Sequence, residues 1–104
     1  MTRTYNGWTN YETWNVALWI GNDQGSYNYW QDVTRECLAE ASPDKNFTIE
    51  ERAKIALAGR LKDEIEEGNP LAKECSLYSD ILTANLKEVH YYEIASNWID
   101  DIKE

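Results

Sequence analysis

Three side chains in this chain could supply a nucleophile or hold a metal ion: Cys37, Cys75 and the single histidine, His90. A Cys–His nucleophile needs a thiol beside an imidazole, but both cysteines fall at apolar positions of expected helices, where a thiol is usually inert. A structural zinc site needs about four Cys or His ligands in close pairs, and the sequence has no such pairs. We therefore expect two reduced, core-facing thiols, no catalytic residue, no metal and no cofactor.

Carboxylates are abundant, because 19 acidic residues outnumber 10 basic ones and give a net charge of −9. This balance disfavours direct nucleic acid binding, which needs a positive surface, and adhesion to an anionic membrane. Four acids gather in the last turns of an expected helix, where the helix dipole favours cations instead: Asp63, Glu64, Glu66 and Glu67. This acidic patch is either a docking surface that mimics a DNA backbone or binds a basic protein, or a plain solvated surface.

The most informative segment is residues 6–20, which places three of the five tryptophans within twelve residues. On a helical wheel one side carries a stripe that we interpret as facing the core. It comprises Tyr11, Trp14, Ala17, Leu18 and Gly21, and Val16 and Ile20 widen it. The other side places polar residues around an aromatic one: Glu12, Asn15, Trp19 and Asn22. Either another element covers this second side, or it binds a partner, since Trp is enriched at interaction hot spots.

Residues 1–8 are expected to form an irregular lead-in, and the helix starts that follow are marked by residues that can cap them. Thr9 with Glu12 has the spacing of a capping box, and Asn10 is the alternative N-cap for a helix that ends near residues 21–22. Later helices are expected to begin after Ser26, Thr48 with Glu51, Ser76, and His90 with Glu93. Gly68 is the expected end of the third helix.

Apolar residues at spacings of three and four predict the inward faces of these helices. They are Trp30, Val33, Cys37, Leu38 and Ala41 in the second helix, Ile49, Ala53, Leu57, Leu61 and Ile65 in the third, Leu77, Ile81, Leu82 and Leu86 in the fourth, and Ile94, Ala95, Trp98, Ile99 and Ile102 in the fifth. No alternating window predicts a strand. The sequence therefore predicts an all-α fold, with one domain over residues 1–104 and about five helices around the aromatic-rich N-terminal helix.

The expected location is the cytoplasm. The N-terminus lacks an apolar signal region, and no segment approaches the roughly 20 apolar residues of a membrane span. The oligomeric state cannot be inferred from these patterns.

The aromatic segment resembles the signature of a family of small uncharacterised proteins encoded by phages, plasmids and bacteria, which reads approximately N-G-W-x-N-Y-E-T-W-x-V-x-L-W-I. The matching positions are Asn6, Gly7, Trp8, Asn10, Tyr11, Glu12, Thr13, Trp14, Val16, Leu18, Trp19 and Ile20. A weaker second block, V-(N/D)-W-x-E-I-A, is similar to residues 89–95, which depart from it at His90 and Tyr91. The resemblance implies one domain but no activity, and no catalytic residue that could be carried over.

Together these patterns favour a non-enzymatic protein that acts through an unidentified protein partner. By analogy with the mobile-element setting of the family it resembles, that partner is a host protein. Two alternatives remain open at this stage: an acidic nucleic-acid mimic that inhibits a DNA- or RNA-binding enzyme, and a small enzyme or ligand-binding protein.

Overall fold

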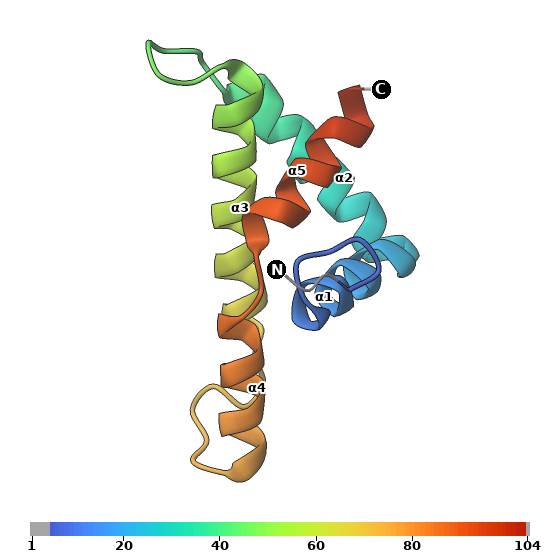
Figure 1. The fold of residues 1–104 in the computed structure, drawn as a ribbon, viewed down its shortest axis with the longest axis vertical. Coiled ribbons are helices and arrows are strands. Elements are labelled where there is room, and N and C mark those ends of the chain that lie inside the picture. Colours follow the sequence, from blue (N-terminus) through green and yellow to red (C-terminus); the bar gives the residue numbers. More distant parts are fainter. Residues whose placement is uncertain (1–4, 104) are drawn as a thin grey trace.

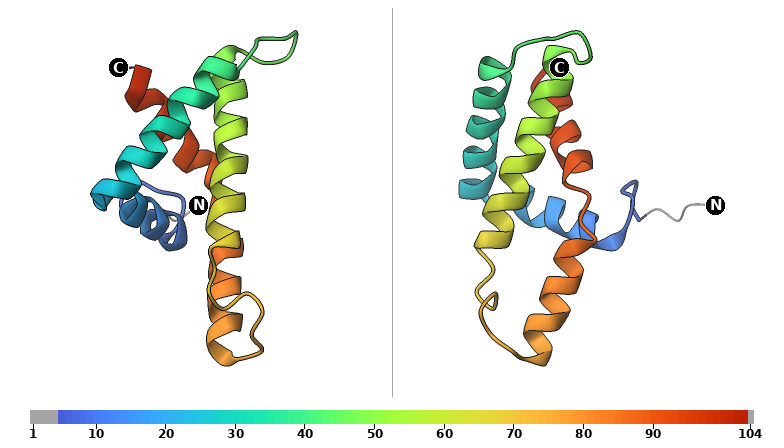
Figure 2. Two further views of the ribbon diagram at one scale, coloured as in Figure 1. Left: turned by 180° about the vertical axis from the view of Figure 1, so that it is seen from behind. Right: turned by 90° about the vertical axis from the view of Figure 1, so that its left-hand side faces the viewer.

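The computed structural model describes residues 5–103, with the backbone alone at residue 103, and this range contains five helices. They are α1 (Tyr11–Asn22), α2 (Gln24–Glu40), α3 (Ile49–Glu67), α4 (Leu77–Lys87) and α5 (Tyr91–Lys103). Helices α2, α3 and α5 lie side by side, α1 runs across the lower end of α2, and α4 projects beyond the end of α3 (Figure 1, Figure 2). The predicted all-α class is confirmed. Residues 1–4 of the expected lead-in lie outside the described part.

The core is centred on α3 and α5 rather than on the aromatic N-terminal helix. The central residues are at most 1% exposed, and they are Ala53, Leu57 and Leu61 of α3 with Ile94, Ala95 and Ile99 of α5. Helix α2 adds Trp30, Val33 and Cys37 to this core. Full burial of each large aliphatic side chain stabilises the fold by about 1.5–3 kcal/mol. The predicted arrangement around the first helix is therefore wrong, although the predicted faces of α3 and α5 supply half of the buried apolar residues of the core.

Helix α1 meets the core through only part of the predicted face, the side that carries Val16, Ala17 and Ile20. Its buried residues are Thr13 and Ile20, and Val16 and Ala17 are partly buried between them. From the predicted stripe, Tyr11 and Leu18 are instead 48% and 38% exposed, and Trp14 and Gly21 are only half-buried. Hydropathy alone does not set the rotation of this helix, because hydrogen bonds at its start hold it in place.

Asn10 is the N-cap of α1, so the alternative cap is confirmed and the Thr9–Glu12 capping box is wrong. The Asn10 Oδ1 atom accepts a hydrogen bond from the Thr13 N–H at 2.9 Å. Its Nδ2 atom donates to the Glu88 carbonyl at 2.7 Å. One side chain therefore caps α1 and ties it to the segment before α5.

Two further contacts complete what we call the α1–α5 latch, the hydrogen bonds between residues 9–13 and residues 88–93. The His90 N–H donates to Thr13 Oγ1 at 2.9 Å, where Thr13 is fully buried. The Thr9 N–H donates to both carboxylate oxygens of Glu93, at 3.1 and 3.2 Å. The predicted His90–Glu93 capping box is therefore wrong, because the Glu93 carboxylate accepts from α1's leading segment instead.

The remaining caps are local and mostly follow the sequence. Thr48 and Glu51 form the predicted capping box, and Gly68 ends α3. Ser76 caps α4 through the Ser79 N–H. Helix α2 begins at Gln24, with Asp23 as N-cap, so Ser26 is not its cap.

A tight turn precedes α1. Asn6 and Gly7 both have positive φ, at 47° and 88°, as the central residues of a type I′ turn require. Two backbone hydrogen bonds, at 2.7 and 2.8 Å, join Tyr5 and Trp8 across it. The Asn-Gly pair is a strong hairpin signal that our sequence interpretation of an irregular lead-in missed.

Helix α4 and the loop before it are more exposed than predicted. Leu77 and Ile81 are 68% and 51% exposed, while Leu82 and Leu86 are half-buried. Helix α4 is exposed because it extends past the three packed helices, so half of its apolar face meets no neighbour (Figure 1).

The two thiols differ in burial. Cys75 is exposed in the loop before α4, so only Cys37 is buried as expected. Burial raises the pKa of the Cys37 thiol.

The latch can be tested with Thr13→Val, which removes the buried hydroxyl that accepts from the His90 N–H and keeps the side-chain shape. An unsatisfied buried donor costs about 1–3 kcal/mol, and we expect the free energy of unfolding in urea to fall by that amount. Thr34→Val is the matched control, because Thr34 is equally buried but only donates within α2, to the Trp30 carbonyl at 2.6 Å. Equal losses in both variants would contradict a special role for the latch.

Candidate functional site

The candidate partner-binding residues share one side of α1 and face away from the core. Trp19 is 71% exposed, Asn22 is exposed, and Glu12 and Asn15 are half-buried. The interpretation in which another element covers Trp19 is therefore wrong for the part of the chain that the structure describes. We call this side, together with the adjoining exposed residues Tyr11 and Leu18, the α1 outer face.

An aromatic cluster continues the α1 outer face toward the Asn6–Gly7 turn. The rings of Tyr5, Tyr11 and Trp14 contact one another, with centroid separations of 4.9–5.5 Å. Tyr5 reaches this position because the tight turn folds the segment back beside α1. Rings that already support one another lose little freedom on binding, which favours their use in recognition.

The α1 outer face is nearly free of charge. Helix α1 has one charged residue, Glu12, in 12 positions, whereas 28% of the whole chain is charged. Enrichment in aromatic residues with depletion of charge is the compositional sign of the central part of a protein interface. The sequence identified Glu12, Asn15, Trp19 and Asn22 for this face, but placed Tyr11 and Leu18 in the core.

The acidic patch is only partly available to a partner. Glu64 accepts hydrogen bonds from the Tyr29 hydroxyl and from Arg60 Nε, the latter at 3.0 Å. The hydrogen bond from Tyr29, and then Arg60, lower the pKa of Glu64. Glu66 pairs with Lys62 at 3.3 Å, while Asp63 and Glu67 are exposed. Two of the four predicted carboxylates are thus already balanced by a basic residue one helical turn earlier.

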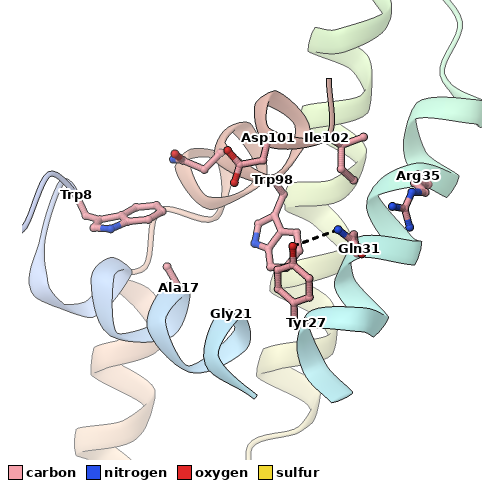
Figure 3. Close-up of a pocket in the computed structure, with 10 residues that line it drawn as sticks. Trp8, Ala17, Gly21, Tyr27, Gln31, Arg35, Trp98, Asp101 and Ile102 are labelled. Carbon is pink, nitrogen blue, oxygen red and sulfur yellow. Dashed lines mark hydrogen bonds between the residues drawn. The ribbon is translucent and has the colours of Figure 1, made fainter. Parts of the chain in front are cut away.

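A pocket of about 470 Å³ lies on the opposite side of α1 from Trp19, between α1, α2 and α5 (Figure 3). Its aromatic residues are Trp8, Tyr27 and Trp98, and Ala17 and Gly21 of α1 form its floor. The Tyr27 and Trp98 rings contact each other at 5.4 Å. The pocket exists because α1 presents two small residues where α2 and α5 diverge.

Polar groups stand around this pocket. Gln31 donates to the Tyr27 hydroxyl at 3.2 Å, and Asn97, Asp101 and Arg35 complete the polar lining. The sequence interpretation assigned Trp98 to a core stripe and gave no binding role to any residue of this pocket. A helix-by-helix wheel cannot reveal a space that three helices enclose together.

The side chains with catalytic or metal-binding chemistry do not gather. Cys37 is buried in the core, whereas Cys75 and His90 are exposed. Among the described side chains, no three His, Cys, Asp or Glu residues are grouped so that they could hold a metal ion. None of the described helices is both long and apolar enough to cross a membrane.

One buried polar atom stands apart from these surfaces. The Tyr91 hydroxyl is buried and makes no well-formed hydrogen bond within residues 5–103, although the Glu66 carboxylate lies close enough to interact with it. Burial, and then the nearby charge of Glu66, raise the pKa of Tyr91 to about 12. The folded state therefore favours the protonated phenol.

Removing this hydroxyl with Tyr91→Phe should leave the free energy of unfolding at neutral pH unchanged or raise it by up to about 1 kcal/mol, because an unpaired buried hydroxyl costs free energy. Since the folded pKa lies above the unfolded one, ionisation of Tyr91 favours the unfolded state, so the wild-type protein keeps its full stability below pH 10 and loses part of it as the pH rises through about 12. Urea unfolding at pH 7 and over this alkaline window measures both effects. A clear loss of stability at pH 7 would show that the hydroxyl has a partner.

Comparison with known proteins gives one match. The profile of a family described as a family of unknown function (DUF7249) matches residues 1–100. No curated protein and no solved structure matches the chain. Both halves of the α1–α5 latch, residues 9–13 and 88–93, lie within the matched range.

Proposed function

We propose that this chain, which belongs to the family of unknown function DUF7249, is a non-enzymatic protein that binds another protein through the α1 outer face. The observation that supports the proposal most directly is the 71% exposure of Trp19 on a helix that the latch holds firmly in place. A buried Trp typically removes about 150–250 Å² from water, so covering this side chain provides a strong driving force for association.

The neighbours of Trp19 indicate what kind of partner it fits. Asn15 and Asn22 offer amide donors and acceptors, and Leu18 and Tyr11 extend the apolar area. A partner surface with an apolar pocket and a polar, weakly charged rim would match this face. We place that partner among the cytoplasmic proteins of a host cell, in the phage or plasmid setting that the signature resemblance suggests.

The acidic patch supports the alternative of a nucleic-acid mimic less well. A mimic presents unpaired negative charge along its surface, but Glu64 and Glu66 already pair with Arg60 and Lys62. Surface ion pairs of this kind contribute little to folding, yet they reduce the charge available to a basic partner. An apolar interface and an electrostatic one also respond differently to salt, which separates the two proposals.

Trp19→Ala should weaken partner binding by about 30-fold or more, the effect of losing a hot-spot residue, while the free energy of unfolding changes by less than about 0.5 kcal/mol. The partner is first captured from a native host lysate and identified, and its affinity is then measured with purified proteins. Tyr78→Ala is the matched control, because Tyr78 is an aromatic residue of α4 with a similar exposure of 73%.

The pair of variants locates the binding surface. Loss of binding in Tyr78→Ala alone would move the interaction to α4 and contradict the proposal. A large loss of stability in Trp19→Ala would show that the side chain serves the fold.

Reversing charge in the acidic patch, with Glu64, Glu66 and Glu67 all changed to Lys, should change the same affinity by no more than about threefold, because the α1 outer face carries almost no charge. Raising the salt concentration from about 0.05 to about 0.5 M should have a similarly small effect. Binding that disappears under either condition would favour the nucleic-acid mimic.

A further inference from the structure

We propose that the pocket between α1, α2 and α5 binds a small organic cation, namely an alkylammonium group with an apolar body. This site lies on the other side of α1 from Trp19, and the inference does not depend on the function proposed above. It rests on the aromatic walls of the pocket, on the charge at its rim and on the open space above Gly21.

The walls present aromatic rings toward a shared space. In Figure 3 the Trp8 ring extends toward Trp98 across the hollow, and the Tyr27 ring lies below Trp98. Three electron-rich rings around one space attract a cation, and Trp is the strongest of the aromatic side chains in this interaction. The contact between Tyr27 and Trp98, together with the hydrogen bond from Gln31 to Tyr27, supports two of these rings before a ligand arrives.

The charges around the pocket select a cation over an anion. Asp101 lies above the hollow between the two indoles (Figure 3), is exposed, and makes no ion pair with the residues that the structure describes. Arg35 lies beyond Trp98 and is paired with Asp32 at 3.5 Å. The net charge of −9 also gives the molecule a field that attracts cations and repels anions.

The floor of the pocket leaves room for a ligand body. A Cβ atom added at Gly21 would meet nothing within 4 Å, so the helix is open toward the pocket at this position. The volume of about 470 Å³ falls within the range of about 300–1,000 Å³ that is usual for small-molecule sites. It exceeds what a single ammonium headgroup fills, so the ligand carries further apolar atoms.

An alkylammonium group can arrive on a free small molecule or on a methylated lysine of a peptide, and both present the same chemistry to the rings. Choline serves as the first probe and a short peptide with one trimethyllysine as the second. The neutral isostere 3,3-dimethylbutan-1-ol and the anion benzoate are the comparison compounds. The indole N–H resonances of Trp8 and Trp98 in a ¹H–¹⁵N spectrum, assigned with single Trp→Phe variants, report binding at the pocket itself.

We expect choline or the methylated peptide to shift both indole resonances and to bind at least about tenfold more tightly than the neutral isostere, which lacks the cation–π attraction. If choline binds at least as tightly as the methylated peptide, the natural ligand is a free alkylammonium compound. If only the peptide binds, it is a modified side chain, and the unmethylated peptide should then fail to bind. Equal affinity for the isostere, tighter binding of benzoate, or no shift with either cation would overturn the proposal.

A pair of adjacent carboxylates provides the decisive control. Asp101→Asn should weaken cation binding several-fold, whereas Asp100→Asn should not, because Asp100 pairs with Lys54 of α3 at 3.2 Å. Both variants change the net charge equally, so a difference between them reports the position of Asp101. Equal effects in the two variants would show that only the overall charge matters.

Gly21→Leu tests the location of the site directly. The added side chain projects into the open space and should abolish the indole shifts while the protein remains helical. Persistent choline binding in this variant would place the cation elsewhere and contradict the proposal.

Discussion

The hydrogen bonds between residues 9–13 and residues 88–93 determine where α1 lies. Both the α1 outer face and the pocket between α1, α2 and α5 depend on that position. The N–H groups of Thr9 and His90 need acceptors once water is excluded, and Glu93 and Thr13 provide them. Leaving either donor unpaired would cost about 1–3 kcal/mol. Many of the polar residues in the two signature segments, near residues 6–20 and 89–95, thus attach α1 to the segment before α5 and to α5 itself. Trp19 makes none of these hydrogen bonds.

Helix α1 separates two surfaces of different character. The side that carries Trp19 is aromatic, exposed and nearly uncharged, which suits contact with the broad surface of another protein. The side that carries Ala17 and Gly21 is small, so it leaves a concave space bounded by α2 and α5. Because the latch fixes the rotation of the helix, both surfaces are present in the free protein and need no rearrangement to receive a ligand.

The elements that the sequence predicted well are those whose signals are local or repeat over many turns. The i+4 stripe of Ala53, Leu57 and Leu61 is correct because burial on α3 follows hydropathy, and the Thr48–Glu51 box needs only its own helix. The rotation of α1 could not be predicted, because it depends on partners 77 to 84 residues away. The exposure of α4 depends on the ends of the neighbouring helices, and the pocket depends on three helices at once. The Asn6–Gly7 turn and the Asp23 cap of α2 have local signals that were readable from the sequence and missed.

The long separation between the two halves of the latch has a consequence for synthesis on the ribosome. Helix α1 emerges first, and the residues that hold it, 88–93, are made 77 to 84 residues later than their partners. A helix of 12 residues is marginal in water on its own, and an N-terminal segment that waits for distant partners exposes its apolar surface meanwhile. A chain that stops before residue 88 therefore contains every residue of the aromatic segment but lacks the hydrogen bonds that hold its surface in place, so the recognition proposed for that surface would require the later residues as well.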